Sequence, residues 1–528
     1  MTDASKKAEQ NTETGSAKDK RPNVTEAPSP VDDLVTTAHN ITLSSGPLKY
    51  HATTGRIVIG EETVNDGTFE GRKPTAEVFV TAYTADDADP FTRPVVFAFN
   101  GGPGSSSVWL HLGLFGPRRV VSGDVENRTP PPYGIEDNLE SLLGQADIVF
   151  IDPITTGYSR TVVGGTPAEY HGFSGDRDLV GETIRLWLSR NERWLSPKFL
   201  AGESYGTTRA AALAGYLTTR HGIAFNGLIL ISSILDFGSV HFSEGNDAPY
   251  VHYLPTYAAI AHYHGKHPRR SLDDVVTEAQ LFAEGDYALA LGRGNRLAEA
   301  EKHAIAERLA SLIGLDADYV VRSDLRVEHK HFFAELLRDR NLVTGRLDAR
   351  FTAHPGDLTL AEQDRDPANF VIIFPYTAAM NHYIRSELGY ASDLTYEILT
   401  DRVKPWSYKE FENRSVTSAE DLSTAMRANP ELKVYVAHGY YDGATPFAAA
   451  EHVFAHLRIG RQANQNIMSR YYEAGHMMYV HEPSRVAQSE HIAQFIDWAT
   501  GGEAPSLEVE RPGKTATDTS GTTGRARS

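Results

Sequence analysis

The chain has 528 residues, enough for two or more domains, and its 41% hydrophobic and 23% charged residues are typical of a globular protein. Its formal net charge of −18 argues against nucleic acid or an anionic membrane surface as a partner. The absence of cysteine excludes disulfides, thiolate metal sites and a cysteine nucleophile.

Both ends of the chain are polar. Residues 1–32 and 503–528 hold few large apolar side chains, so we expect two disordered tails. The first 32 residues contain no apolar segment typical of a signal peptide, and no run approaches the roughly 20 apolar residues that span a bilayer. With no cysteine either, we expect a cytoplasmic protein that does not bind membranes, although secretion by another route stays open.

Between the tails, short apolar runs alternate with helical patterns. Apolar residues follow helical spacing over 179–188, and strand-like pieces with glycine-rich turns occupy 41–85. Unbroken β-branched, aliphatic or aromatic runs, typical of strands buried on both faces, occur at 95–99, 148–151, 228–231 and 434–436. This pattern predicts an α/β fold with a mostly parallel central sheet, an antiparallel N-terminal edge and covering helices.

Residues 236–429 have a different character, because helical segments dominate. One of them, at 297–313, is followed by Gly314 as a stop signal. We interpret this interval as a helical cap inserted into a core formed by residues 33–235 and 430–502.

The strongest local motif is a serine between glycines. Residues 202–206 read Gly-Glu-Ser-Tyr-Gly, directly after an apolar strand and directly before a helical pattern. This is the context of a nucleophile elbow, in which a sharp turn exposes a serine hydroxyl above an α/β-hydrolase sheet. A glycine-rich turn with an incidental serine is the alternative for this motif alone. Ser204 is therefore the candidate nucleophile.

A serine hydroxyl needs a base to remove its proton and a carboxylate to orient that base. In α/β-hydrolases the order along the chain is serine, acid, histidine. Asp442 follows the run at 434–436, and His476 follows another short strand in a glycine-containing loop. The sequence thus predicts a Ser204–Asp442–His476 triad, although its 21 histidines leave many that serve only packing.

A second glycine-rich turn follows the strand at 95–99. Residues 100–107 read Asn-Gly-Gly-Pro-Gly-Ser-Ser-Ser, and glycines here let backbone amides approach a ligand. We expect an oxyanion hole formed by the amides of Gly102 and Tyr205. A phosphate-binding loop is the alternative, but neither of its usual motifs is present.

These motifs together resemble the serine carboxypeptidase family. The resemblance rests on residues 100–107, 202–206 and 474–477 (Ala-Gly-His-Met), in this order and at these separations. Residues 151–159, Ile-Asp-Pro-Ile-Thr-Thr-Gly-Tyr-Ser, are similar to a further family segment. The similarity covers roughly residues 40–235 and 430–500, whereas the cap matches only in position.

Membership would imply removal of single residues from peptide C-termini through a Ser204 acyl-enzyme, with a peptide as substrate. In the family, the terminal carboxylate is read by residues that correspond to Asn100, Gly101 and Glu203. Glu203 must be protonated to donate to a carboxylate, which implies a raised pKa or an acidic optimum.

The sequence departs from the family pattern at three places. Ser105 stands where the family usually has cysteine, and the acid loop reads Gly-Tyr-Tyr-Asp at 439–442 instead of Gly-Asp-x-Asp. Leu114 stands where the family usually places a glutamate that pairs with the acid beside the nucleophile. Without that second carboxylate, like-charge repulsion no longer raises the pKa of Glu203. We therefore expect a pH optimum closer to neutral than is usual for the family.

Two other functions stay open. An α/β-hydrolase with the same triad would serve as an esterase, amidase, aminopeptidase or acyltransferase, and the unmatched cap and Leu114 favour keeping this alternative. A catalytically inactive binding protein is the second alternative, although every catalytic position is filled. The oligomeric state, including a homo-oligomer, is not decided by the sequence.

A group of histidines in the cap raises the question of a metal. Residues 262–267 read His-Tyr-His-Gly-Lys-His, and His252 lies in the preceding helical pattern. No carboxylate pattern adjoins them, and Arg269 and Arg270 follow closely. A solvated loop is the better interpretation, so we expect neither a metal nor a cofactor.

Overall fold

The computed structural model describes residues 29–362 and 365–505. Apart from residues 29–32 and 503–505, the two predicted tails lie outside this part of the chain. Within it, no helix combines the length and the apolar character needed to cross a bilayer.

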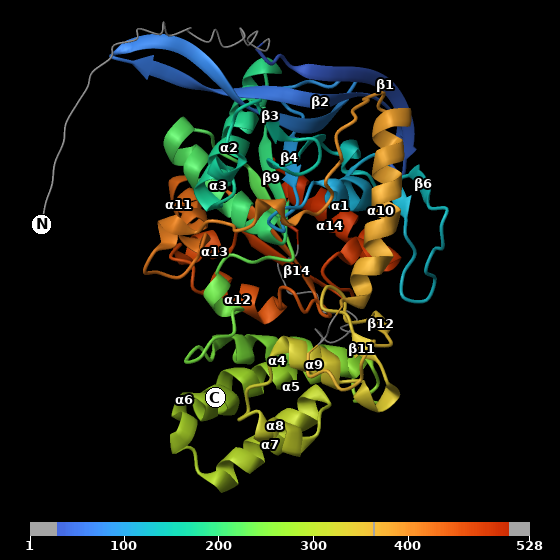
Figure 1. Cartoon of the computed structure of the whole chain (residues 1–528), viewed down its shortest axis with the longest axis vertical. Coiled ribbons are helices and arrows are strands. Elements are labelled where there is room, and N and C mark those ends of the chain that lie inside the picture. Colours follow the sequence, from blue (N-terminus) through green and yellow to red (C-terminus); the bar gives the residue numbers. More distant parts are fainter. Residues whose placement is uncertain (1–28, 363–364, 506–528) are drawn as a thin grey trace, which may run out of the picture.

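A single twisted sheet forms the centre of the molecule (Figure 1). Its strands follow the order β1-β2-β3-β7-β4-β9-β10-β13-β14, and the short β8 pairs with β3. The strands from β7 to β14 are parallel, whereas β1, β2 and β3 are antiparallel to their neighbours. The predicted mostly parallel sheet with an antiparallel N-terminal edge is confirmed, and it is the sheet of an α/β-hydrolase fold. The strands are β1 (Asp33–Leu43), β2 (Gly46–Asn65), β3 (Thr68–Ala85), β4 (Val95–Phe99), β7 (Asp147–Ile151), β8 (Arg160–Thr161), β9 (Lys198–Glu203), β10 (Gly227–Ile231), β13 (Lys433–Gly439) and β14 (Ile467–Tyr472), with the small pairs β5 (Arg118–Val121)/β6 (Gly134–Asp137) and β11 (Val343–Thr344)/β12 (Thr352–Ala353) outside it.

Helices cover both faces of this sheet because its central strands are buried on both sides. Side chains of one face pack with helices α2, α3, α11 and α12, and those of the other face pack with α1, α10 and α14. These helices are α1 (Val108–Leu110), α2 (Phe173–Arg190), α3 (Tyr205–His221), α10 (Pro367–Ser386), α11 (Ala419–Ala428), α12 (Phe447–Ala455) and α14 (Glu482–Ala499), and the one-turn α13 (Arg461–Asn464) precedes β14.

A separate helical layer lies below the sheet in Figure 1. Its helices share one hydrophobic cluster, which also includes Tyr440, Tyr441, Phe447 and Tyr471 from the core. The interval 236–429 thus supplies helices to both layers, because α10 and α11 pack against the core. The helices of the lower layer are α4 (Ala248–Tyr263), α5 (Leu272–Phe282), α6 (Ala288–Arg293), α7 (Glu299–Ile313), α8 (Ala317–Arg322) and α9 (His329–Glu335).

A buried ion pair joins the two helices nearest the β4 turn. Arg209 on α3 donates through Nε to the Asp176 carboxylate on α2 at 2.6 Å, and both side chains are almost fully buried. The same guanidinium donates to the carbonyl oxygen of Asn100 at 2.6 Å. The pair therefore fixes the turn after β4 against α3.

We expect Asp176→Ala to lower the free energy of unfolding by about 3–5 kcal/mol, because it leaves the Arg209 charge buried without a counter-ion. Asp178→Ala is the matched control, since Asp178 pairs with its neighbour Arg177 at the surface and should cost less than about 0.5 kcal/mol. Urea unfolding measures both. Equal shifts of the two midpoints would contradict this account of the pair.

Candidate active site

Ser204 lies in a sharp turn between β9 and α3. Its backbone has φ 60° and ψ −129°, a conformation that costs an ordinary residue about 1–3 kcal/mol. The flanking glycines permit this turn. A Cβ on Gly202 would lie 2.1 Å from the carbonyl oxygen of Gly206, and one on Gly206 would lie 2.7 Å from that of Phe99. The serine is thus held above the carboxyl ends of β4 and β9.

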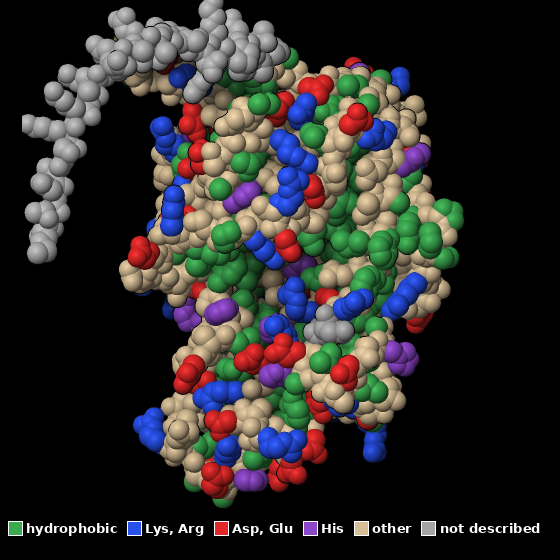
Figure 2. Space-filling view, in the orientation of Figure 1, with side chains coloured by type: hydrophobic (Ala, Val, Ile, Leu, Met, Phe, Trp, Pro, Cys, Tyr) green, Lys and Arg blue, Asp and Glu red, His purple; other side chains and the backbone are tan. Residues whose placement is uncertain are grey.

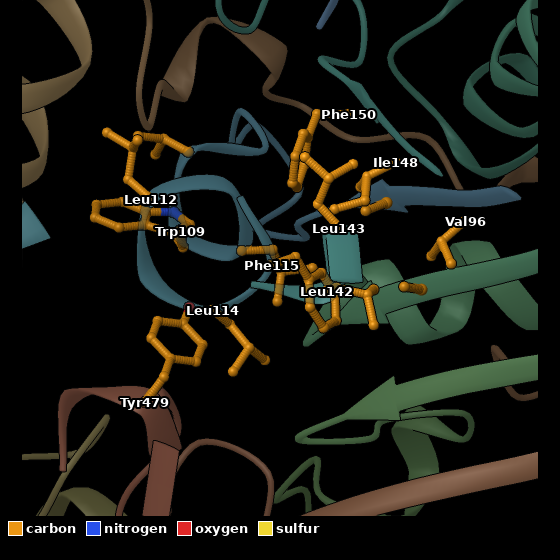
Figure 3. Close-up of a cluster of buried hydrophobic side chains, with 14 of the residues drawn as sticks. Val96, Trp109, Leu112, Leu114, Phe115, Leu142, Leu143, Ile148, Phe150 and Tyr479 are labelled. Atoms are coloured by element: carbon orange, nitrogen blue, oxygen red, sulfur yellow. The ribbon is translucent and has the colours of Figure 1, made fainter. Parts of the chain in front are cut away.

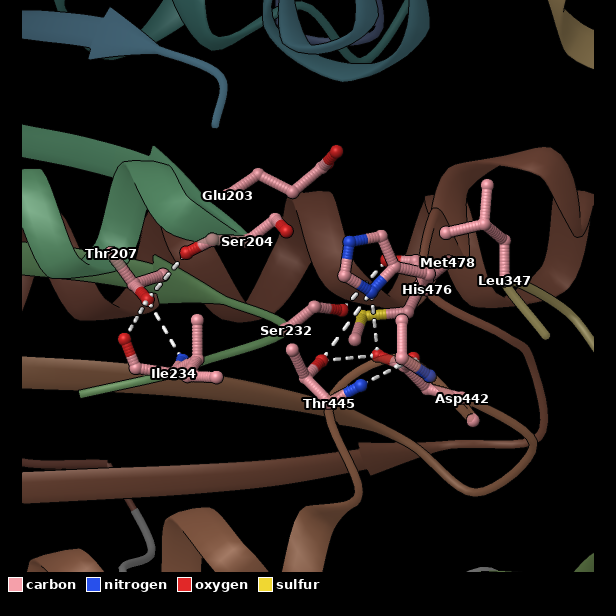
Figure 4. Close-up of polar contacts among 12 residues, drawn as sticks. Glu203, Ser204, Thr207, Ser232, Ile234, Leu347, Asp442, Thr445, His476 and Met478 are labelled. Atoms are coloured by element: carbon pink, nitrogen blue, oxygen red, sulfur yellow. Dashed lines mark hydrogen bonds and ion pairs between the residues drawn. The ribbon is translucent and has the colours of Figure 1, made fainter. Parts of the chain in front are cut away.

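Asp442 and His476 follow the carboxyl ends of β13 and β14. The Nδ1 atom of His476 lies 2.8 Å from Oδ2 of Asp442, and both side chains are buried. A carboxylate only accepts, so Nδ1 carries the proton and Nε2 is the basic nitrogen. Figure 4 shows the Ser204 side chain facing the His476 ring. In the described part of the chain no hydrogen bond joins the two, as is common before substrate tightens the contact.

Several groups hold the acid and the histidine in place. Asp442 Oδ2 accepts a hydrogen bond from the Thr445 hydroxyl at 2.6 Å, and Oδ1 accepts from the amides of Ala444 and Thr445. The backbone of His476 donates to the carbonyl of Leu347 and accepts from the Ser232 hydroxyl (Figure 4). The Asp442 carboxylate thus orients the imidazole, while Leu347 and Ser232 fix the backbone of His476.

The electrostatics of this pair suit a general base. Burial alone would raise the pKa of Asp442, but His476 and the hydrogen bonds of Thr445 hold it below its ordinary value. Burial opposes protonation of His476, yet Asp442 and Glu203 outweigh it and raise its pKa. An ionised Asp442 thus stabilises the imidazolium that forms when the serine is deprotonated.

The turn after β4 packs tightly on the nucleophile elbow. A Cβ on Gly101 would lie 2.4 Å from the amide nitrogen of Tyr205, so only glycine fits there. Tyr205 is the first residue of α3, where the amide has no acceptor within the helix. Gly102 adopts φ 101° directly after this contact. The structure therefore places the turn that contains Gly102 against the start of α3, and the oxyanion role of the Gly102 and Tyr205 amides stays a prediction.

Glu203 is a buried acid next to the nucleophile. Asn100 Nδ2 donates to its Oε1 at 3.0 Å, and the Tyr479 hydroxyl donates to its Oε2 at 2.7 Å. Burial raises the pKa of Glu203 to about 7, although His476, Tyr479 and Asn100 partly offset this effect. The carboxyl group is therefore protonated below neutral pH without help from a paired acid.

Leu114 occupies the position where the family usually has that paired acid. It is buried in the hydrophobic cluster of one sheet face, which also contains Tyr479 (Figure 3). A Cβ on the adjacent Gly113 would lie 2.4 Å from the Tyr479 ring. The Tyr479 hydroxyl and the Asn100 amide, not a second carboxyl group, are thus the partners of Glu203.

Some residues of the site escaped the sequence analysis. Thr445 follows Asp442 by three residues, a spacing that permits a local side-chain bond to the carboxylate. Tyr479, Ser232 and Leu347 carry no such signal, because they reach the site only through the fold.

The cap histidines have backbone partners. The Nε2 atoms of His262, His264 and His267 lie 2.7–2.9 Å from carbonyl oxygens, which only accept, so each ring donates. The segment 262–266 is partly or fully exposed, whereas His267 is buried, so the expectation of a solvated loop is wrong for this one residue. The described residues contain no cluster suited to a metal ion.

We expect Gly101→Ala to slow labelling of Ser204 by a fluorophosphonate about 100-fold, the usual effect of losing one oxyanion donor. The added methyl would displace the Tyr205 amide, whose nitrogen lies 2.4 Å from the position that the new Cβ would take. Labelling followed by gel fluorescence measures the rate without any assumption about substrate.

Gly134→Ala is the control, because its Cβ would meet side-chain atoms only at 3.5 Å or more. It should label at the normal rate. An unchanged rate in Gly101→Ala would remove the Tyr205 amide from the oxyanion hole.

Known proteins provide an independent comparison. Residues 69–266 match the model of the serine carboxypeptidase family. Serine carboxypeptidase-like 9 of Arabidopsis thaliana is 27% identical over 222 residues, which cover 39% of this chain and 44% of the relative. Serine carboxypeptidase-like 16 of the same plant is 25% identical over 202 residues, covering 36% and 42%. The chain thus spans less than half the length of the curated relatives it matches.

Solved structures that align with the chain are more distant. The proline iminopeptidase of Mycobacterium smegmatis is 12% identical with a TM-score of 0.33, and the alignment covers 84% of this chain and 99% of that one. A putative aryl esterase from Burkholderia cenocepacia is 13% identical with a TM-score of 0.31, covering 88% and 99%. The fold assignment rests on the strand order of the sheet and not on these scores. The family match over residues 69–266 and the glycine turns that carry the nucleophile support a serine hydrolase that is similar to the serine carboxypeptidases over this part of the chain.

Proposed function

We propose that the protein is a serine-type carboxypeptidase that releases C-terminal residues from peptides. The observation that carries this proposal is the buried Glu203, whose pKa is raised to about 7 directly beside the nucleophile. A neutral carboxyl group in this position donates a hydrogen bond to a carboxylate, which an ionised one would repel. A free peptide C-terminus is the substrate group that such a site favours.

In the proposed reaction, Ser204 attacks the last peptide carbonyl while His476 Nε2 accepts its proton. The amides of Gly102 and Tyr205 stabilise the oxyanion. The imidazolium then protonates the departing amine, and the C–N bond breaks. Water, deprotonated by His476, hydrolyses the acyl-enzyme and regenerates Ser204.

Substrate recognition would use the groups on the other side of the elbow. Glu203 donates to the terminal carboxylate, together with Asn100 and the amide of Gly101. Tyr479 keeps Glu203 in place through its 2.7 Å hydrogen bond. An esterase or amidase without carboxylate recognition has no use for a neutral acid here, which favours the carboxypeptidase over that alternative.

A peptide with a free C-terminus should be cleaved about 100-fold faster than its C-terminal amide, because the amide loses charge-assisted hydrogen bonds. Mass spectrometry of the released products measures both rates. Ser204→Ala should abolish cleavage of each peptide. Equal rates on acid and amide would replace the proposal with another hydrolase activity.

The pH dependence of kcat/KM gives a second test. Activity requires neutral His476 and neutral Glu203, so it should rise as the imidazolium loses its proton and fall as Glu203 ionises above about pH 7. The two groups interact, so the observed pKa values belong to the pair. In Glu203→Gln the amide donates at every pH, so the alkaline decline should disappear.

The same profile tests the near-neutral optimum, which the burial-raised pKa of Glu203 supports even without the paired acid at position 114. A wild-type maximum below about pH 5 would contradict it. Glu482→Gln is the control, because this surface acid pairs with Arg485 and Arg119 and does not contact Glu203. The alkaline decline should persist in it.

A further inference from the structure

The segment around Arg346 is bonded to both catalytic loops. The amide of Gly443, next to Asp442, donates to the Arg346 carbonyl at 2.9 Å. The amide of His476 donates to the carbonyl of Leu347 at 2.6 Å. Residue 346 therefore lies beside the triad by virtue of backbone bonds alone.

Close packing and a second set of bonds hold this segment in place. A Cβ on Gly475 would lie 2.4 Å from the Cβ of Asp348, so the chain runs directly against the histidine loop. The Asp366 carboxylate accepts from the amides of Arg346 at 3.2 Å and Leu347 at 2.9 Å. The backbone that carries Arg346 thus has little freedom to move away from the triad.

The guanidinium of Arg346 has no counter-ion in the described part of the chain. Asp366 already accepts from three backbone amides, and Asp348 pairs with Arg350 at 2.6 Å. Arg350 is buried and also pairs with Asp124, whereas Arg346 is partly exposed. Figure 2 shows a hollow between the core and the helical layer, with Lys or Arg side chains at its edge.

The charge of Arg346 acts on the catalytic histidine. Burial and, more weakly, this guanidinium oppose protonation of His476, although Asp442 and Glu203 keep its pKa above the ordinary value. The same charge acts on Asp366, where burial raises the pKa and Arg346 counteracts it. The guanidinium therefore lies within electrostatic range of the catalytic imidazole, as the backbone bonds of residues 346 and 347 also indicate.

We propose that Arg346 is a specificity-determining residue that pairs with a carboxylate side chain next to the scissile bond. The preferred substrates are then peptides with Asp or Glu in one of the last two positions. The guanidinium fork matches a carboxylate with two parallel N–H groups. This site differs from Asn100, Gly101 and Glu203, which would bind the terminal carboxylate, and the inference rests on the proposed function.

Matched benzoylated dipeptides test the inference. The pair Glu-Ala and Gln-Ala places the carboxylate before the scissile bond, and the pair Ala-Glu and Ala-Gln places it on the leaving residue. In one of the two pairs, the wild-type enzyme should have a Glu-to-Gln ratio of kcat/KM of about ten, the value of one charge-assisted hydrogen bond. Arg346→Gln should lower this ratio about tenfold.

Two further variants separate charge from structure. Arg346→Lys should retain an intermediate ratio, because it keeps the charge but not the fork. Arg269→Gln removes the same charge from an exposed cap residue and should leave the ratio at the wild-type value. A ratio that stays unchanged in Arg346→Gln, or that falls equally in Arg269→Gln, would overturn the inference.

An ester assay distinguishes failure of this inference from failure of the proposed function. The α-ethyl esters of benzoyl-glutamate and benzoyl-glutamine require no peptide bond and no terminal carboxylate. Suppose that the enzyme prefers the glutamate ester over the glutamine ester through Arg346 but cleaves no peptide. This result would refute the proposed carboxypeptidase activity and would support pairing of Arg346 with a carboxylate side chain before the scissile bond. Peptide cleavage without a preference for Glu in either pair would support the carboxypeptidase activity and refute the role of Arg346.

Discussion

The close approach of two glycine turns is the constraint on which the site depends. One turn follows β4 and the other follows β9, and these strands are hydrogen-bonded neighbours in the sheet. Because Gly101, Gly202 and Gly206 have no side chains, the turns touch through their backbones. That contact places amide donors, the nucleophile and Glu203 within one small volume. The triad loops after β13 and β14 complete the site from the side.

Burial strongly affects the pKa values of the site residues. Asp442, His476 and Glu203 are all buried, yet their environments shift the pKa values of the two carboxyl groups in opposite directions. Hydrogen bonds and His476 keep Asp442 ionised, whereas Glu203 accepts its hydrogen bonds from the neutral groups of Asn100 and Tyr479, and its pKa rises to about 7. Two carboxyl groups near one imidazole thus hold different protonation states at the same pH. The buried environment of Glu203 thus raises its pKa although Leu114 stands where a paired acid would lie.

Much of the core could be predicted from the sequence because its signals are local. The runs that became β4, β7, β10 and β13 are continuous and apolar, and turns that bind ligand through the backbone must contain glycine. Tyr479 and Arg346 carried no such signal, because a tyrosine or an arginine has many roles and only the tertiary structure assigns one. The helices of residues 236–429 were predicted as one cap because the sequence does not show which of them pack against the core. Helical spacing shows which face of α10 or α11 is apolar but not which layer will bury it.

The shared hydrophobic cluster of the lower helices has a consequence for cooperativity. Tyr440 and Tyr441 lie in the loop that leads to the catalytic acid, and Tyr471 lies on the strand before the catalytic histidine, yet all three pack with α4, α5 and α9. Detaching those helices would expose aromatic surface on the loop that precedes Asp442. We therefore expect the helical layer and the loop of the catalytic acid to unfold together, although they belong to separate layers of the molecule.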